Sequence, residues 1–333
     1  MSKRKSLMDI EVDVRGLLNG SSKEIPNIDL VSNEPKTDSM TVEKALNIIT
    51  RQMEVSGNRS RTISDYQLHV NHFQTITNAI YMTDISIDSI YKWLESMNVS
   101  NQTKLTRLKC FKAFLSRCFD NGWIETKFWK TIKVKVDQKV KEGATDKEVN
   151  LLLSLLDLNH FVELRDAVAV LVMYKTGVRI NTLSKLEESH INFDDNSLVL
   201  DGEIMKNHQG LILPFDETMN KLLRVLINQN NIIRRDYKKN NKKLFITRFG
   251  DEISTSPSHN NIQKRLHKYS KLYNLKNINP HALRRGFAKN LLDNGASIPL
   301  ISKALGHGDI GVTTKYLFID MKDVAQNLRG FLK

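Results

Sequence analysis

Apolar residues recur at steps of three and four positions through most of the first half of the chain. The longest such series consists of Leu105, Leu108, Phe111, Leu115 and Cys118. A second series upstream consists of Tyr66, Val70, Phe73 and Ile76. This spacing places each set on one side of a helix, where it can be buried against neighbouring helices. The pattern therefore predicts four or five helices between residues 41 and 130, packed as a small all-helical domain.

A helix-capping motif marks the start of a second domain. Thr145 and Glu148 form a capping box, in which the two side chains satisfy the first free amides of a helix. Residues 151–156 and 161–174 that follow are apolar on nearly all sides. A helix without a polar face belongs in a protein interior, so both segments are predicted to form buried helices.

The apolar period shortens between residues 191 and 214. Three short apolar segments in this region are separated by turn-forming residues, and they span 191–193, 198–200 and 211–213. Such a pattern predicts a small antiparallel sheet inside a largely helical domain. Residues 231–243 are basic and rich in Asn, so we expect a loop there.

These patterns divide the chain of 333 residues into four parts. Residues 1–40 are polar, and we expect a flexible or loosely helical leader. The helical domain spans 41–130, and a basic linker, 131–144, alternates Lys with apolar residues. That alternation fits either a strand or a tether lying along a phosphate backbone. The mixed domain spans 145–333 and ends in a short apolar helical tail, 317–333.

The net charge of the chain gives information on its binding partner, and not only on its fold. Lys and Arg exceed Asp and Glu by 13, and the sequence pI is about 9.5. The first 40 residues hold six basic and seven acidic side chains, so the excess belongs to the two domains. Nucleic acid is the commonest partner of such a protein. A basic surface that serves only solubility is the alternative.

Cysteine usage and hydropathy indicate a soluble protein of a reducing compartment. Cys110 and Cys118 lie eight residues apart on one predicted helix, too far along its axis to form a disulfide. No Cys/His cluster has the spacing of a zinc site, so we predict neither a metal nor another cofactor. The sequence contains no signal peptide and no apolar run long enough to span a membrane, which predicts a cytoplasmic location.

Six residues of the mixed domain have the chemistry of phosphoryl transfer. They are Arg179, Lys206, His281, Arg284, His307 and Tyr316. His281 and Arg284 form an H-x-x-R motif, and His307 closes Leu305-Gly306-His307, nine residues before Tyr316. In this order the set resembles that of the tyrosine recombinase (phage integrase) family.

The chemistry of these side chains agrees with the resemblance. The phenol oxygen of Tyr316 can attack phosphorus directly, and the resulting phosphotyrosine ester conserves the bond energy, so rejoining needs neither ATP nor a metal. Arg179 and Arg284 can hold the nonbridging oxygens through fixed forks of N–H donors. The family resemblance makes His281 the group that accepts the proton of Tyr316, and His307 a hydrogen-bond donor to the phosphate.

The departing 5′ hydroxyl needs a proton, and Lys206 is our candidate for the general acid. Lys206 lies on the turn between the second and third predicted strands, eight residues before Pro214. His208 on the same turn is a rival candidate. A Lys in a polar turn is ordinarily an exposed side chain without a catalytic role, so this assignment depends on the resemblance.

The resemblance also implies an architecture and a set of DNA contacts. It implies a mainly α protein with a small antiparallel β-sheet, in which a helical core-binding domain and a mixed α/β catalytic domain clamp double-stranded DNA. Within the helical domain and linker we predict six DNA-binding cations: Arg59, Arg61, Lys104, Arg107, Lys133 and Lys135. The alternative for each is a solvated position on the basic face of a helix bundle.

Strand exchange in this family involves two DNA sites and four protomers. The tail 317–333 would pack on a neighbouring protomer, or back on its own, and the resemblance leaves room for an accessory DNA-bending or directionality protein. Such an enzyme, a phage integrase or the recombinase of another mobile element, would be found with the nucleoid.

Four positions depart from the usual family pattern. Thr182 stands where Glu is customary, Leu211 where a basic residue is, and Arg285-Gly286 where His or Lys precedes Thr or Ser. These departures motivate a second hypothesis, a DNA-binding regulator that keeps the fold without catalysis. A type IB topoisomerase, a third hypothesis, would use nearly the same active site but fits less well with a short chain and an apolar tail.

Overall fold

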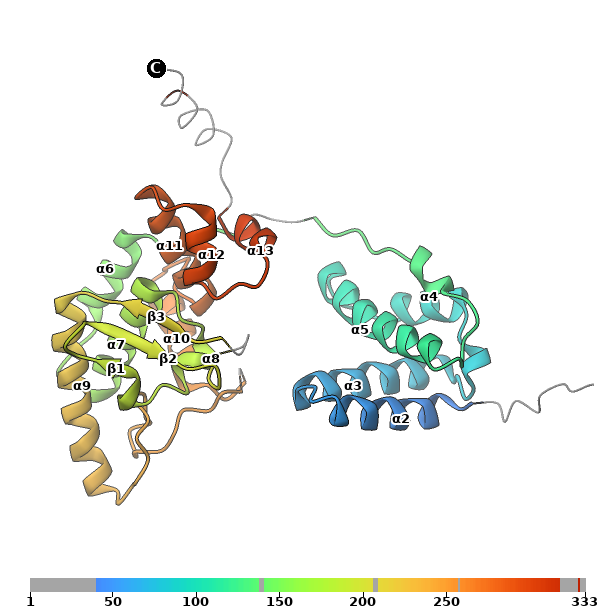
Figure 1. Ribbon diagram of the computed structural model, residues 1–333, viewed down its shortest axis with the longest axis horizontal. Coiled ribbons are helices and arrows are strands. Elements are labelled where there is room, and N and C mark those ends of the chain that lie inside the picture. The colour runs from blue at the N-terminus through green and yellow to red at the C-terminus, as the bar shows by residue number, and fades with distance from the viewer. Residues whose placement is uncertain (1–39, 138–140, 206–208, 257, 318–328, 330–333) are drawn as a thin grey trace, which may run out of the picture. The chain divides into compact units, whose positions relative to one another are not determined.

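The computed structural model describes residues 40–137, 141–205, 209–256, 258–317 and 329 (Figure 1). The chain divides into two compact units, Met1–Gln138 and Lys139–Lys333. The predicted leader lies outside the described residues except for Met40. The predicted tail also lies outside them, except for Leu317 and Arg329.

The first unit is helical. Its elements are α2 (Val42–Val55), α3 (Ser60–Thr77), η1 (Met82–Asp84), α4 (Ile87–Glu95), α5 (Asn101–Asp120) and η2 (Phe128–Thr131). Thr41, Ser86 and Ser100 begin α2, α4 and α5, because each side-chain oxygen accepts a hydrogen bond from an amide of the first turn. Residues 132–137, where a strand was one of two expectations, form neither a helix nor a strand.

Aromatic side chains hold the core of this unit together. Phe111 of α5 lies 4.3 Å from Phe73 of α3 and 5.2 Å from Trp93 of α4, measured between ring centroids. All three are fully buried. The two predicted apolar series are the sides of α3 and α5 that face this core, although Ile76 and Leu105 at their ends are half-buried.

The second unit combines helices with a small sheet. Its elements are α6 (Asp146–Leu155), α7 (Phe161–Thr176), α8 (Ile180–Leu183), η3 (Glu188–His190), β1 (Ile191–Asn192), β2 (Ser197–Leu200), β3 (Leu211–Pro214), α9 (Glu217–Asp236), α10 (Asn261–Leu272), α11 (Pro280–Asp293), α12 (Ile298–Ala304) and α13 (Ile310–Tyr316). The three strands are antiparallel in the order β1-β2-β3, with Leu198 opposite Leu213. The predicted fold class, mainly α with a small antiparallel sheet, is confirmed.

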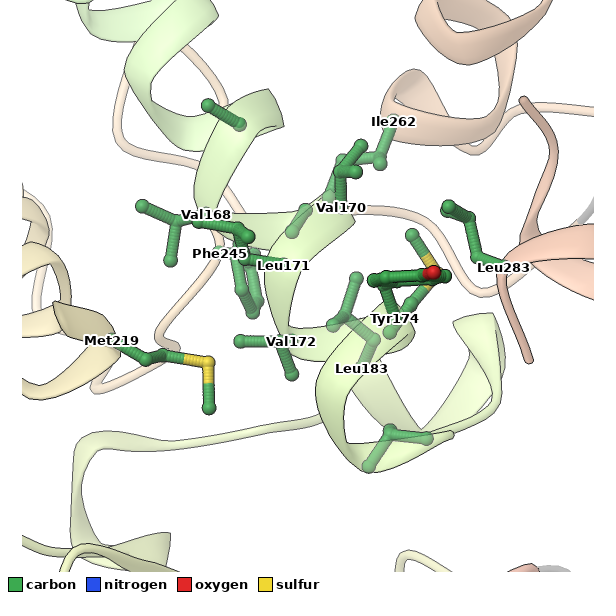
Figure 2. Packing of buried hydrophobic residues seen from close by; sticks show 14 of the residues in the cluster. Val168, Val170, Leu171, Val172, Tyr174, Leu183, Met219, Phe245, Ile262 and Leu283 are labelled. Carbon is green, nitrogen blue, oxygen red and sulfur yellow. The ribbon is translucent and has the colours of Figure 1, made fainter. Parts of the chain in front are cut away.

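Helix α7 is the centre of the second unit. Every residue from Leu164 to Tyr174 is buried, and α9, α10 and α11 all contact this helix. Figure 2 shows side chains of α7 among Met219 of α9, Ile262 of α10 and Leu283 of α11. The prediction of a helix buried on all sides is correct for α7.

Two predictions for this unit are wrong. Helix α6 is buried on one side only, since Val149 and Leu152 are buried while Leu151 and Leu155 are exposed. Helix α9 continues to Asp236, so the first half of the expected loop 231–243 is helical. The amphipathic spacing of α9 continues through these polar residues as far as Arg234. The guanidinium of Arg234 donates hydrogen bonds to Glu188 and to the carbonyl of Lys243.

A buried ionic cluster ties α7 to α10. Asp166 is fully buried and accepts hydrogen bonds from Arg165 (2.6 Å), from Arg265 and from the hydroxyl of Tyr269 (2.9 Å). Arg165 also donates to the carbonyl of Ile246 at 3.0 Å. Each buried charge therefore has an opposite charge and further hydrogen bonds, as burial of ions requires.

Removal of this carboxylate should destabilise the second unit. In Asp166→Ala the buried Arg165 loses its counter-charge, and we expect the free energy of unfolding to fall by about 3–5 kcal/mol. Asp293→Ala, which breaks the exposed pair with Lys289, should cost about 0.5 kcal/mol or less. Urea titrations followed by circular dichroism measure both.

The chain carries an internal control for this experiment. The three tryptophans, Trp93, Trp123 and Trp129, all lie in the first unit. Tryptophan fluorescence should therefore report an unfolding transition that Asp166→Ala leaves in place. Equal losses in Asp166→Ala and Asp293→Ala would contradict the assignment of a structural role to the buried cluster.

Candidate active site

The end of α7 places the first arginine. Gly177 ends the helix in the left-handed conformation (φ 67°), where a side chain would be strained, and a Cβ there would lie 2.3 Å from the ring of Phe287. Arg179 follows as the N-cap of α8. Its guanidinium donates to the carbonyl of Gly306 at 3.5 Å, so this arginine reaches the segment between α12 and α13.

Arg284 contacts the segments that carry Arg179 and His307. It lies on α11, which starts with Asn279 as N-cap and Pro280 at the first position. Only 4% of Arg284 is exposed. Its guanidinium donates to the carbonyls of Gly177 and Leu305 and to Nε2 of His307, the last at 3.0 Å. The structure therefore brings Arg179, Arg284 and His307 together.

His307 lies directly after Gly306, whose positive φ of 57° turns the chain at the end of α12. Burial, together with the cations Arg284 and Arg179, lowers the pKa of His307 to about 4. The imidazole is therefore neutral at pH 7. Its Nδ1 lies 2.9 Å from the hydroxyl of Thr313 on α13.

His281 lies one turn before Arg284 on the same helix, and its side chain remains accessible to solvent. Partial desolvation lowers its pKa, and the charges of Arg285, Arg284, Lys141 and Arg179 act in the same direction. A neutral imidazole can accept a proton, which is the state that the predicted general base requires.

Two of the six predicted residues are described incompletely or not at all. Tyr316 is the last residue of α13, and its side chain lies outside the description. Leu317 after it is buried with Phe287, Ile301 and Leu305, so the end of α13 is anchored beside α11 and α12. Lys206 and its rival His208 lie outside the described residues.

The departures from the family pattern make contacts of their own. Thr182 is buried, and its hydroxyl donates to the carbonyl of Ile204 at 3.3 Å, two residues before Lys206. Leu211 is half-buried in β3. A Cβ at Gly286 would lie 2.4 Å from the carbonyl oxygen of Ala144, so the bare backbone is required at this contact.

The chain segment that enters the second unit packs closely on α11. The amide of Ala144 donates to the carbonyl of Ala282 at 2.8 Å, and Arg285 donates to the carbonyl of Glu142 at 2.9 Å. A Cβ at Gly143 would lie 2.6 Å from the amide nitrogen of Gly286. The sequence analysis missed this contact, and the two glycines were its signal.

None of the six predicted DNA-binding cations is buried. Arg59, Arg61, Lys133 and Lys135 are exposed, and Lys104 and Arg107 are half-buried on α5. Arg61 pairs with Asp65 at 3.0 Å. Arg59 is the N-cap of α3, and Arg61 lies in its first turn. Their contact with DNA stays a prediction.

A membrane-spanning helix and a metal-binding cluster are both absent from the described residues. No helix among them is both long enough and apolar enough to cross a membrane. The described part of the chain also holds no cluster of three or more His, Cys, Asp or Glu side chains that could bind a metal ion.

Comparison with known proteins agrees with the geometry. The sequence model described as the phage integrase family matches residues 144–322. The tyrosine recombinase XerC of Chlamydia muridarum (strain MoPn / Nigg) is 27% identical over 225 residues, covering 67% of this chain and 69% of that protein. XerD of Chlamydia pneumoniae is 26% identical over 276 residues, covering 78% and 85%.

Two solved structures share the fold. The Tn1549 transposon integrase in complex with transposon right end DNA matches with a TM-score of 0.67 at 15% identity, over 88% of this chain and all of that one. A lambda integrase dimer bound to a COC′ core site matches with a TM-score of 0.66 at 14% identity, over 91% of this chain and 84% of that one.

The lowered pKa of His307 predicts a pH dependence of stability. Below pH 6.5 the unfolded chain binds a proton at this ring, while the folded protein resists protonation down to about pH 4. The free energy of unfolding should therefore fall as the pH drops through this window. His307→Gln removes the titrating group but keeps the polar contacts, so its urea midpoint should depend less steeply on pH between 6.5 and 4. Identical pH profiles for the two proteins would contradict the assignment.

The close packing at Gly286 predicts that an added methyl group destabilises the protein at this position but not at Gly308. Gly286→Ala should lower the free energy of unfolding by about 1–3 kcal/mol, because the new methyl group meets the backbone of Ala144. Gly308 has a negative φ and nothing within 4 Å of an added Cβ, so Gly308→Ala should stay within about 0.5 kcal/mol. Thermal unfolding of both variants measures the difference, and equal losses would rule out a close contact at Gly286.

Proposed function

The chain belongs to the phage integrase family, and we propose that this site-specific DNA recombinase cuts and rejoins DNA through Tyr316. The observation that supports the proposal most directly is the environment of Arg284. This buried guanidinium binds the carbonyl groups of Gly177 and Leu305 and the ring of His307, so that residues from three separate segments meet at one point.

The side chains of this chain can supply each proton transfer that the proposed reaction needs. The phenol oxygen of Tyr316 attacks phosphorus, and its proton passes to His281. The bond from phosphorus to the 5′ oxygen breaks, and Lys206 supplies the proton of the departing hydroxyl. A 3′-phosphotyrosyl ester remains, and a 5′ hydroxyl of another strand reverses the reaction, so the two steps consume no ATP.

The described residues are best suited to stabilising charge in the transition state of the reaction. In the transition state negative charge collects on the nonbridging oxygens, and Arg179 and Arg284 provide planar sets of donors for them. Preorganised donors of this kind are each worth about 3–4 kcal/mol. The hydrogen bonds of Arg284 to main-chain carbonyls hold its guanidinium in place before the substrate arrives.

Double-stranded DNA is the proposed partner of both the helical unit and the catalytic unit. The Tn1549 integrase and lambda integrase structures contain DNA, and one of lambda integrase is a tetramer bound to a Holliday junction. By analogy four protomers of this chain would assemble on two DNA sites in the nucleoid, with the tail 317–333 as the contact between them. An accessory DNA-bending or directionality protein fits the same scheme.

The XerC and XerD relatives are named as recombinases, and none of the comparisons favours the alternative of a non-catalytic regulator. That alternative rested on unusual residues around the arginines, of which Thr182 and Gly286 make contacts of their own. No described feature favours a topoisomerase over a recombinase.

Covalent trapping tests the proposed function. Nicked duplexes that carry the DNA flanking the gene should give a protein–DNA adduct that survives denaturation. Tyr316→Phe should abolish the adduct, and Tyr237→Phe, which changes an exposed tyrosine elsewhere in the same unit, should leave it intact. Arg284→Lys should slow adduct formation by about 10²–10³-fold, since an ammonium cannot replace the fork of donors. Tight, site-specific binding without any adduct would establish the regulator instead.

A further inference from the structure

His307 lies between a guanidinium and a hydroxyl group. Its Nε2 is 3.0 Å from Nη2 of Arg284, and its Nδ1 is 2.9 Å from Oγ1 of Thr313. A guanidinium has only donors, so Nε2 must offer a lone pair to it. The ring proton of the neutral imidazole is then on Nδ1, and it is donated to the hydroxyl of Thr313. The two contacts together select one tautomer and one ring orientation.

Thr313 is fully buried, unlike its neighbour Thr314, which is exposed. It lies on α13, three residues before Tyr316, and its carbonyl accepts the amide of Leu317 at 2.9 Å. A helix of seven residues has little stability of its own. The position of α13 therefore depends on its tertiary contacts, which include its contact with α12, the burial of Leu317 and the bond between His307 and Thr313.

We propose that Thr313 is a positioning residue, whose hydroxyl holds the His307 ring in the orientation in which Nε2 faces Arg284. The ring thereby keeps its Nδ1–H tautomer, and the helix that carries the nucleophile is locked to Arg284. This inference rests on the proposed function, because it assigns α13 the task of presenting Tyr316 to the phosphate. Thr313 itself touches neither the substrate nor the reacting atoms in this scheme.

The arrangement also explains how His307 can serve the phosphate. The Nδ1–H group exists both in this neutral tautomer and in the imidazolium ion, so the bond to Thr313 persists when the ring gains a proton. A phosphate entering beside Arg284 brings negative charge, which favours protonation of Nε2. The ring then exchanges an accepted bond from Arg284 for a donated bond to the phosphate, without turning.

Three variants of the full-length protein test the proposal. Thr313→Val keeps nearly the same shape and removes the acceptor, Thr313→Ser keeps the hydroxyl, and Thr314→Val is the matched control on the exposed side of α13. With the nicked duplex, Thr313→Val should form the covalent adduct about 10–100-fold more slowly, as loss of an orienting partner does at other sites. Thr313→Ser should restore most of the rate, and Thr314→Val should retain it. DNA affinity should change in none of them.

Nitrogen NMR of the ¹⁵N-histidine-labelled protein gives a readout that does not depend on activity. In the wild type at pH 7, His307 should carry its proton on Nδ1, and Thr313→Val should lose this single tautomer. A proton on Nε2 in the wild type, or a Thr313→Val variant with unchanged rate and tautomer, would overturn the proposal. Equal losses of rate in Thr313→Val and Thr313→Ser would overturn it as well.

The two readouts separate this inference from the proposed function. If the wild type forms no adduct, the proposed function fails, and the NMR spectra still decide whether Thr313 selects the tautomer. If Thr313→Val does not fold, the wild-type spectrum and Thr313→Ser remain decisive, since the first requires no variant and the second retains the hydroxyl.

Discussion

Burial of the Arg284 guanidinium is the constraint on which the second unit depends. A guanidinium cannot lose its charge, so burial requires acceptors around it. The carbonyl of Gly177 at the end of α7, that of Leu305 at the end of α12, and the ring of His307 supply them. Two chain segments that lie more than a hundred residues apart in sequence, the end of α7 and the end of α12 with the residues after it, must therefore meet next to α11. The catalytic geometry follows from the need to solvate one charge.

Much of the fold could be predicted because its signals are local. The capping box at Thr145, the Asn279-Pro280 helix start and the glycine stop at Gly177 each depend on a few neighbouring residues. The errors lie where distant contacts decide. Leu151 is exposed on α6 although it lies in a mostly apolar segment, and α9 runs on through polar residues because Arg234 finds partners on η3 and in the segment before Leu244.

The candidate site shows the same division. Motif spacing predicted Arg179, Arg284 and His307, which the structure brings together, since each motif is short and contiguous. It could not predict that Arg284 would be buried, that Gly286 would meet the chain entering the unit, or that Thr313 would form a hydrogen bond with His307. Some of these contacts join residues that are far apart in sequence. The others join nearby residues, and their geometry depends on how the chain folds. A Thr at position 313 has no pattern that distinguishes it from Thr314.

Burial lowers the pKa of both histidines of the site, and the nearby charges, which are all cations, act in the same direction. Arg284 and Arg179 act on His307, and Arg285, Arg284, Lys141 and Arg179 act on His281. Without DNA both rings are therefore held neutral, and neither can donate a proton as an acid. A phosphodiester bound among the arginines offsets their charge and raises both pKa values. The substrate itself would then supply the field in which His281 accepts the phenolic proton and His307 becomes a donor, so proton transfer is coupled to occupation of the site.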